Sequence, residues 1–276
     1  MIQVKIKKTI VRAFLALLII TQVYPLLWLV LYSFKTNEEI LSSTFFALPQ
    51  VMKWENYTNA FVNGHYLQYL WNSVIVTGIS MIITLVLGAM VSYAIGRFKW
   101  KASKIVMLVF LIGIMIPTQA TLIPLVVLFN KLHIMDTHLS LILPYIAFSV
   151  PMAVFILSEF YKGIPHELEE SAAIDGASIY RIFISIIFPI TIPPLMTVSI
   201  VTFINIWNEY IMAATFISSS HLKTLPFGIY SFVGKYTTNY GAIGAYLILG
   251  VIPVLIVYFL LADKITQGMV AGAVKG

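Results

Sequence analysis

Six long apolar stretches alternate with shorter polar segments along this chain of 276 residues. An α-helix needs about 20 predominantly apolar residues to cross a bilayer, and each of these stretches is long enough. The pattern predicts an all-α integral membrane protein with one membrane domain over residues 1–276. The predicted transmembrane helices lie at about 13–34, 70–96, 105–130, 139–160, 183–217 and 240–262.

Composition supports a membrane class and excludes several others. Apolar residues make up 60% of the chain and charged residues 10%, whereas soluble domains carry about 25% charged residues. The chain has no cysteine, so disulfides and thiolate metal sites are excluded. The net charge of +6 does not indicate nucleic-acid binding, because the basic residues are scattered among loops rather than gathered on one face.

The distribution of lysine and arginine predicts the orientation. With the N-terminus inside, the inner segments hold twelve of the 17 basic residues and the outer segments hold five. Such an excess is typical of cytoplasmic loops. Six spans return the chain to the starting side, so we expect both termini and the segment at 163–181 to be cytoplasmic. The predicted location is the inner membrane of the cell.

Prolines in or beside the spans predict that several helices are not straight. A proline has no backbone N–H, so the carbonyl one turn earlier in the helix loses its hydrogen-bond donor and must be satisfied by neighbouring groups. The residues concerned are Pro25, Pro117, Pro124, Pro144, Pro151, Pro189, Pro193, Pro194 and Pro253.

The acidic segment between the fourth and fifth spans predicts a short, solvated helix. Pro165 can begin a helix, and Glu167, Glu169 and Glu170 then fall where the positive end of the helix dipole favours them. Gly176 can adopt the left-handed conformation that ends a helix. This helix could dock an external partner or lie on the membrane surface without one, and composition alone leaves both interpretations open.

The spacing of this segment resembles the EAA loop of permeases from ABC importers. The resemblance is carried by Glu170, Ser171, Ala172, Gly176, Ile186, Phe188 and Pro189. It departs from the family pattern at Ser171, which replaces an alanine, and at Phe188, which replaces a leucine. The resemblance implies a coupling loop at 163–181 that docks on an ATPase. The coupling residues it implies are Glu169, Glu170, Ser171, Ala172, Asp175, Gly176 and Pro189.

Further segments are similar to the carbohydrate branch of these permeases, close to the second permease of the maltose type. They are residues 203–210, 222–228 and 268–276. The resemblance implies a type I importer half with the MetI-like fold. It also implies a second permease subunit, two ATPase subunits and an extracellular sugar-binding protein. The chain has no G-x-x-x-x-G-K-[ST] motif, so it is predicted to be non-catalytic, with ATP and magnesium bound by the partner ATPases.

Polar residues near the outer end of the fifth span are candidates for the substrate pathway, because polar groups within spans usually face a cavity or a neighbour. They are Asn205, Trp207, Asn208 and Glu209. The alternative is that these side chains hydrogen-bond between helices or across the interface with a partner permease.

Two other segments are expected to meet partners. Resemblance to the maltose-type permease implies that an outer loop with Lys223, Thr224, Leu225 and Pro226 faces the binding protein. A competing interpretation packs this loop on the partner permease alone. A cytoplasmic tail at 264–276 is expected to contact the ATPases through Gly272, Lys275 and Gly276.

Other functional classes fit the sequence less well. An intramembrane enzyme would need paired ionisable residues deep in the spans, and a stand-alone ion-coupled carrier tends to show internal repeats and mid-membrane carboxylates. The chain shows neither, and its five histidines have no metal-ligand spacing. An ABC permease for a solute other than a sugar remains open, as does the identity of the sugar.

Overall fold

The computed structural model describes residues 2–42, 47–98, 100–234 and 236–273, with side chains for residues 8–260 of those ranges. The described chain is built from helices and the segments that join them. It divides into two compact units, residues 1–67 with 228–253 and residues 68–227 with 254–276. The two units are described in turn.

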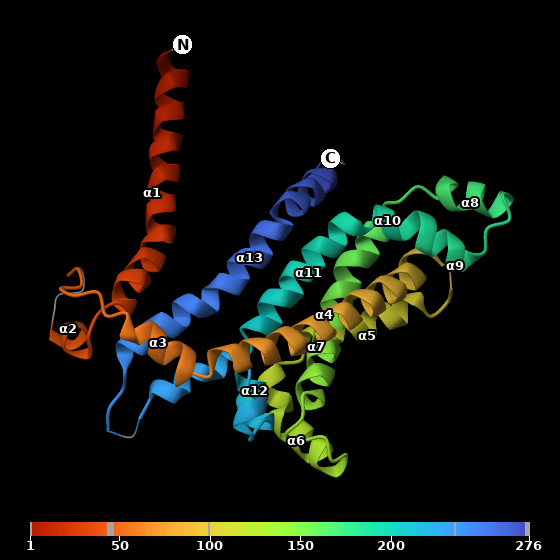
Figure 1. Cartoon of the computed structure of the whole chain (residues 1–276). Coiled ribbons are helices and arrows are strands. Elements are labelled where there is room, and N and C mark those ends of the chain that lie inside the picture. The colour runs from red at the N-terminus through yellow and green to blue at the C-terminus, as the bar shows by residue number, and fades with distance from the viewer. Residues whose placement is uncertain (1, 43–46, 99, 235, 274–276) are drawn as a thin grey trace. The chain divides into compact units, whose positions relative to one another are not determined.

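The first unit contains three helices from the start of the chain and the first part of the last helix (Figure 1). They are α1 (Ile2–Ser33), α2 (Asn37–Ser42), α3 (Glu55–Val62) and α13 (Tyr240–Ala273). The buried Asn56 of α3 donates to the carbonyls of Ser33 and Lys35 at 2.8 and 2.9 Å. These bonds hold the end of α1 to α3, because they satisfy carbonyls that a helix terminus leaves without intrahelical partners.

Helix α1 is apolar but is not covered by its own chain. None of its most apolar 18-residue window is buried, and its mean hydropathy there is 2.3. An apolar face of this kind needs lipid or another protein around it. The feature agrees with a membrane-spanning first helix.

The second unit contains the remaining helices. Its long helices are most of α4 (Tyr66–Arg97), α5 (Ser103–Met115), α6 (Leu122–Lys131), α7 (Leu139–Lys162) and α11 (Ile192–Trp207). Shorter segments are α8 (Glu167–Ile174), α9 (Ile179–Ile182), α10 (Phe188–Ile190) and α12 (Ile211–Phe216), with turns at Thr118–Thr121 and Ser220–Leu222. A further turn, Leu225–Phe232, begins in this unit and ends in the first. Helix α7 packs against both α5 and α11.

The span predicted at 105–130 is bent by 92° between α5 and the segment Thr118–Lys131. The bend lies at Ile116 and Pro117, both of which are extended, with ψ of 117° and 122°. A proline disfavours the helical conformation of the residue before it. Pro117 therefore explains why this apolar run is not one straight helix.

The span predicted at 183–217 is also divided. A π-helical turn at Phe183–Ile187 precedes α10, and the chain bends by 72° between Ile179–Ile190 and α11. Pro193 and Pro194 begin α11 and have no N–H to donate to the preceding turn. A second break at 208–210 separates α11 from α12, so residues 211–218 do not continue the fifth span as one helix.

Among the described residues, four helices are long and apolar enough to cross a membrane, or up to six if each bent pair is one span. The last helix, α13, continues to Ala273. Residues 264–273 are therefore helical, although the sequence analysis placed them in a tail. Lys275 and Gly276 lie outside the described residues.

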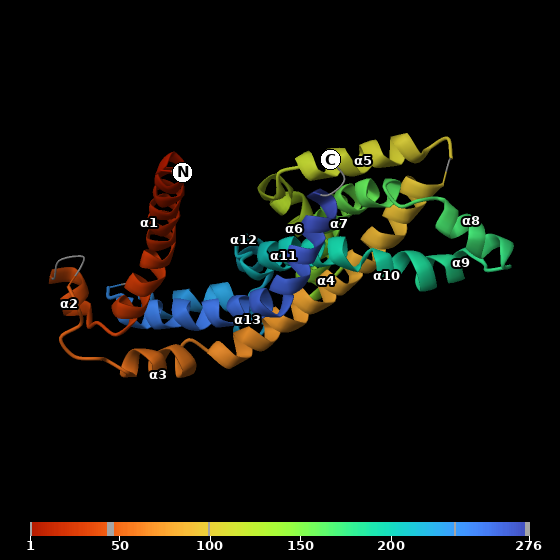
Figure 2. The same ribbon diagram turned by 90° about the horizontal axis from the view of Figure 1, so that it is seen from above.

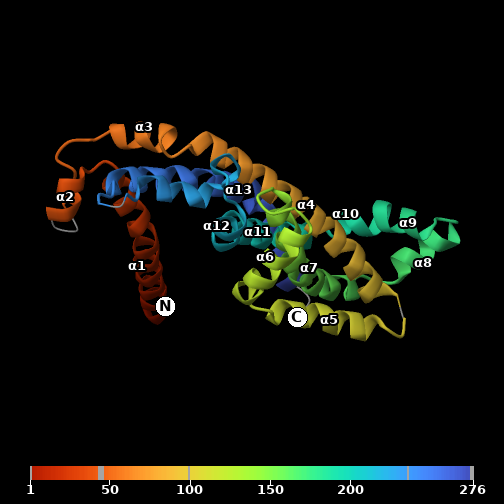
Figure 3. The ribbon, with the colours of Figure 1, turned by 90° about the horizontal axis from the view of Figure 1, so that it is seen from below.

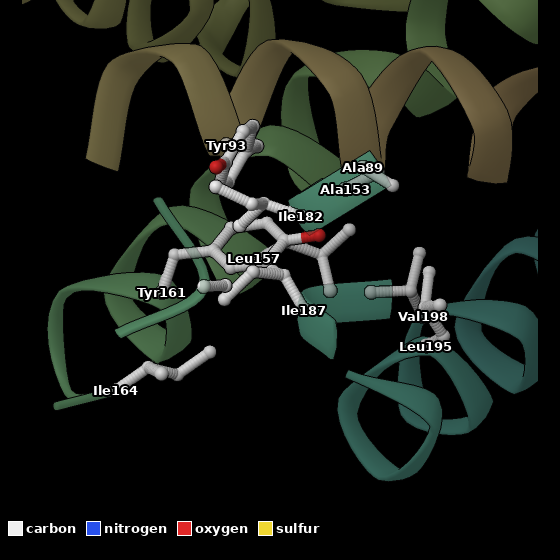
Figure 4. Packing of buried hydrophobic residues seen from close by; sticks show 11 residues of the cluster. Ala89, Tyr93, Ala153, Leu157, Tyr161, Ile164, Ile182, Ile187, Leu195 and Val198 are labelled. Atoms are coloured by element: carbon white, nitrogen blue, oxygen red, sulfur yellow. The ribbon is translucent and has the colours of Figure 1, made fainter. Parts of the chain in front are cut away.

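A hydrophobic cluster joins the helices at the α8 end of the second unit. Figure 4 shows Tyr93 of α4 and Leu157 and Tyr161 of α7 gathered around Ile182 and Ile187. Ala172 of α8 belongs to the same cluster. Figures 2 and 3 show α8 and α9 together at one end of this unit, while Figure 1 shows α6 at the opposite end. We refer to these as the inner and outer ends, following the predicted orientation.

Candidate functional site

Helix α8 presents a polar surface, as its sequence predicts. Glu167, Glu169 and Glu170 lie in its first turn, where the helix dipole favours carboxylates. The helix begins at Glu167, two residues after Pro165. Ala172 is buried, whereas Glu170, Ser171 and Asp175 are exposed. The exposed residues form a surface that another protein can contact.

Gly176 ends this helix in the way the sequence analysis predicts. Its φ is +79°, in the left-handed region that glycine adopts without steric cost. Its N–H donates to the carbonyl of Ala173 at 3.0 Å. The next helix, α9, starts at a proper N-cap, because the Ser178 hydroxyl accepts from the Arg181 N–H.

Glu169 faces its own chain rather than solvent. Its carboxylate accepts from Nε and Nη2 of Arg97, at 3.0 and 2.7 Å. The Arg97 side chain is 1% exposed and that of Glu169 is 17% exposed. From the sequence, Arg97 is predicted only to be one of the positive charges on the inner side, and its pairing with Glu169 is not predicted. Its position in the last turn of an apolar span was the available signal for a structural role.

A cavity of about 340 Å³ lies among α5, α7, α11 and α12 in the second unit. Its lining mixes apolar side chains with polar ones. The polar residues are Thr118, Tyr145, Ser149, Thr202, Asn205 and Glu209. Hydroxyl, amide and carboxylate groups of this kind can hydrogen-bond a polyhydroxylated ligand.

Two of the four predicted pathway residues, Asn205 and Glu209, line this cavity. Trp207 is 4% exposed and stacks on Phe203 with ring centroids 5.2 Å apart. Asn208 is exposed and donates to the Ile204 carbonyl at 2.9 Å. Trp207 and Asn208 are not among the residues that line the cavity.

Glu209 also shapes the backbone beside the cavity. Its carboxylate accepts from the Met212 N–H at 2.8 Å and from the Tyr145 hydroxyl at 2.6 Å. The first bond caps the start of α12. Glu209 therefore has both of the roles considered from its sequence. It hydrogen-bonds to another helix through Tyr145, and it lines the cavity.

The outer segment around Lys223 is held inside its own unit. Lys223, Thr224 and Leu225 are at most 7% exposed, and Pro226 is half-buried. Asn72 donates to the carbonyls of His221 and Lys223, and the Leu225 N–H donates to the Ser73 hydroxyl. The Lys223 ammonium lies 3.8 Å from the centre of the Phe227 ring and donates to the Ile217 carbonyl. Burial lowers the pKa of this lysine.

Asp136 fixes the start of the same outer segment. It adopts a φ of +56°, and its carboxylate accepts from the hydroxyl and N–H of Ser219 and from the Ser218 N–H. These hydrogen bonds, led by the Ser219 hydroxyl, hold the pKa of Asp136 below its ordinary value. The loop at 132–138 is thereby attached to the loop at 217–220.

The remaining predicted contacts lie near the C-terminus. Gly272 lies within α13, and Lys275 and Gly276 fall outside the described residues. Within the described ranges, no group of three or more His, Asp or Glu side chains could hold a metal ion.

Comparison with known families gives a match over most of the chain. Residues 85–270 match the family described as "Binding-protein-dependent transport system inner membrane component". The matched range contains α8, the cavity and the outer segment.

Individual proteins are similar over nearly the whole length. An ABC transporter permease protein of Caldicellulosiruptor sp. is 41% identical over 263 residues, covering 95% of both chains. The diacetylchitobiose uptake system permease protein NgcG of Streptomyces coelicolor is 33% identical, covering 93% of this chain and 87% of that one. A solved chain from a bacterial ABC transporter that imports alginate, an acidic polysaccharide, has a TM-score of 0.79 at 17% identity, covering 94% of this chain and 96% of its own. The last similarity concerns the fold alone.

Proposed function

Because the chain belongs to the family of inner-membrane components of binding-protein-dependent transport systems, we propose that it forms one half of the pathway of an ATP-driven sugar importer. It is a multi-pass inner-membrane permease, and it is the non-catalytic component of an ABC transporter. An ATPase and a binding protein are its partners by family. The finer assignments below are proposals.

The observation that carries the proposal is the exposed, acidic helix α8. It is eight residues long, ends at a left-handed glycine and keeps Glu170, Ser171 and Asp175 exposed. We propose that this surface seats in a cleft of an ATPase, with two ATPase subunits serving a pair of permeases. ATP and magnesium are bound by the ATPases, and the motion that hydrolysis drives reaches this chain through α8.

The pairing with a second permease rests on uncovered apolar surface. Helix α1 has no buried residue within its most apolar window. A different permease subunit and lipid together are the proposed cover for it. The sequence resemblance favours the second-permease position for this chain.

A neutral saccharide of a few units is the proposed substrate. The similar protein from Streptomyces coelicolor is named for diacetylchitobiose uptake. The cavity between α7 and α11 offers Asn205, Thr202 and Ser149 as hydrogen-bonding groups. Asn205 and Glu209 are the proposed contacts for sugar hydroxyls along the pathway, while Trp207 and Asn208 support the end of α11.

The outer segment is the proposed contact for the binding protein. Lys223, Thr224 and Leu225 are buried, so they support the contact rather than make it. Their exposed neighbours Ser220 and His221 are the side chains that reach the binding protein. The tail, with Gly272, Lys275 and Gly276, is a further proposed contact to the ATPases.

Replacement of Gly176 tests the coupling proposal. Gly176→Pro removes the N–H that donates to Ala173 and imposes a φ near −65° where the chain needs +79°. Transport should be abolished in reconstituted vesicles, while the subunit still inserts in the membrane. Gly78→Ala is the matched control, because a Cβ at Gly78 meets nothing within 4 Å. Normal uptake by the Gly176→Pro transporter would remove α8 from the mechanism.

A further inference from the structure

Arg97 joins three helix ends at the inner side of the second unit. Its guanidinium donates to the Glu169 carboxylate of α8. It also donates to the carbonyls of Tyr161 and Ile164, at 3.0 and 2.6 Å, and to that of Pro165 at 3.3 Å. One side chain from the end of α4 therefore binds the end of α7, the turn after it, and α8.

One carbonyl that Arg97 meets, that of Tyr161, lies in the last turn of α7, and the other two follow the end of that helix. The last carbonyls of an α-helix have no intrahelical donor, and a basic side chain can supply one. Arg97 acts in this way at the end of α7. The planar fork of an arginine carries five N–H donors on three nitrogens, whereas a lysine carries three on one nitrogen and reaches less widely spaced acceptors.

Helix α8 is otherwise attached through one buried residue and through the Tyr93 side chain of α4, which interacts with the Glu169 carboxylate. Ala172 is its buried residue, and its remaining side chains are exposed or half-buried. The α4 and α7 ends to which Arg97 ties it are in turn closely packed. A Cβ at Gly96 would come 3.1 Å from the Tyr161 Cβ, and Tyr93 and Tyr161 contact each other edge to face.

Stability alone is a weak reason for such a pair. A charged group that is 1% exposed loses its hydration, and a buried ion pair often contributes no more than an apolar replacement of similar volume. What the pair does supply is direction. Two hydrogen bonds hold Arg97 to Glu169 of α8, and three more hold the same guanidinium to the end of α7 and the turn after it.

We infer that Arg97 is the positioning residue that makes α8 and the inner ends of α4 and α7 move as one body. The inference rests on the proposed function, in which ATPases pull on α8. With the link intact, displacement of α8 carries α4 and α7 with it. Without the link, α8 follows the ATPase while the transmembrane helices lag, and ATP is hydrolysed without transport.

Spin-label distances test this inference in the complete transporter. The chain has no cysteine, so labels can be placed at will. One label replaces the exposed Glu167 of α8 and the other the exposed Glu159 of α7. With Arg97 present, the distance between them should be narrow and equal in the nucleotide-free and ATP-trapped states. In Arg97→Met it should broaden and shift when ATP is trapped.

Transport supplies a second readout that loss of folding does not imitate. In Arg97→Met, the number of sugar molecules moved per ATP hydrolysed should fall several-fold, while the assembled complex still hydrolyses ATP. Arg97→Lys should restore little of the loss, because the lysine cannot span the four acceptors. Lys104→Met, at an exposed basic residue of α5, should change neither readout. Should Arg97→Met fail to assemble, Glu169→Gln tests the same link, with a smaller change in the same direction.

Different results contradict the role of Arg97 and the proposed function on which it rests. The inference alone is overturned if the Arg97→Met complex contains the ATPases and keeps two wild-type properties. These are the narrow distance between the labels and the number of sugar molecules moved per ATP hydrolysed. If the ATPases do not associate with α8 in the wild-type complex, the proposed function fails first.

Discussion

At the scale of single residues, Asp136 is the clearest case of a charge that holds one outer loop to another. Its three acceptor contacts to Ser218 and Ser219 favour the ionised carboxylate, which is why its pKa lies below the ordinary value of 3.8. A depressed pKa contributes stability above the unfolded value. That contribution is lost as the pH falls through the folded value.

Asp136→Asn should therefore lower the thermal midpoint of the purified complex at pH 7. The difference from wild type should shrink as the pH falls from about 4 through the lowered pKa of the folded carboxyl, because the stabilisation by the wild-type carboxylate is lost over this range. Glu167→Gln is the control, since Glu167 lies on the exposed face of α8. A midpoint difference that stays constant from pH 7 to pH 3 would contradict this account.

Tyr145 is a second residue whose role follows from one contact. Its hydroxyl donates to Glu209 at 2.6 Å, and the residue is 5% exposed. Removing a hydrogen bond to a charged group costs about 1.5–3 kcal/mol. Tyr145→Phe should destabilise the subunit by that amount in a denaturation assay, whereas Tyr180→Phe, at a residue 78% exposed, should be neutral. Equal stability of the two variants would show that the Tyr145–Glu209 bond is dispensable.

At the scale of elements, the turn between α8 and α9 depends on one backbone conformation. A Cβ at Gly176 would meet nothing within 4 Å, so the cost of alanine there comes from the left-handed φ alone, about 1–2 kcal/mol. Gly176→Ala should reduce transport partially, by weakening the seat of α8, and Gly176→Pro should abolish it. Initial rates of uptake in vesicles with matched protein content measure this order. Equal initial rates of uptake for Gly176→Ala and Gly176→Pro would contradict this prediction.

Elements that depend on local chemistry were predictable from the sequence. The acidic first turn of α8 and the left-handed Gly176 follow from helix-dipole and glycine preferences. The bend at Pro117 was predictable in kind, since proline placement indicated helices that are not straight, but its angle of 92° was not. Hydropathy counts apolar residues and does not record the direction of the helix axis.

Features that depend on contacts distant in sequence were not predictable. Arg97 and Glu169 are 72 residues apart, and nothing in either local pattern indicates the other. The same holds for the Asn72 contacts that bury Lys223 and its neighbours, 149 and 151 residues away. Asn205 and Glu209 could be proposed as pathway residues because they are polar within an apolar run, but only the packing separates them from Trp207 and Asn208.

At the scale of the whole molecule, this subunit is proposed to work only in an assembly. Its first helix is uncovered, its cavity wall comes from α5, α7, α11 and α12, and α8 carries exposed acidic residues. Each of these surfaces has a proposed partner: the second permease with lipid, the sugar, and the ATPase.

Photo-cross-linking from α8 tests the central claim most directly. A photoreactive residue is placed at Ile174, which is 86% exposed on α8, and in a second protein at Tyr236, which is 88% exposed in the first unit, shortly before α13. In membranes that contain the whole transporter, the Ile174 probe should form a product with the co-purifying ATPase, identified by its P-loop peptide, and the Tyr236 probe should not. If illumination attaches the ATPase to neither site or to Tyr236, α8 does not dock the ATPase, and the coupling mechanism is contradicted.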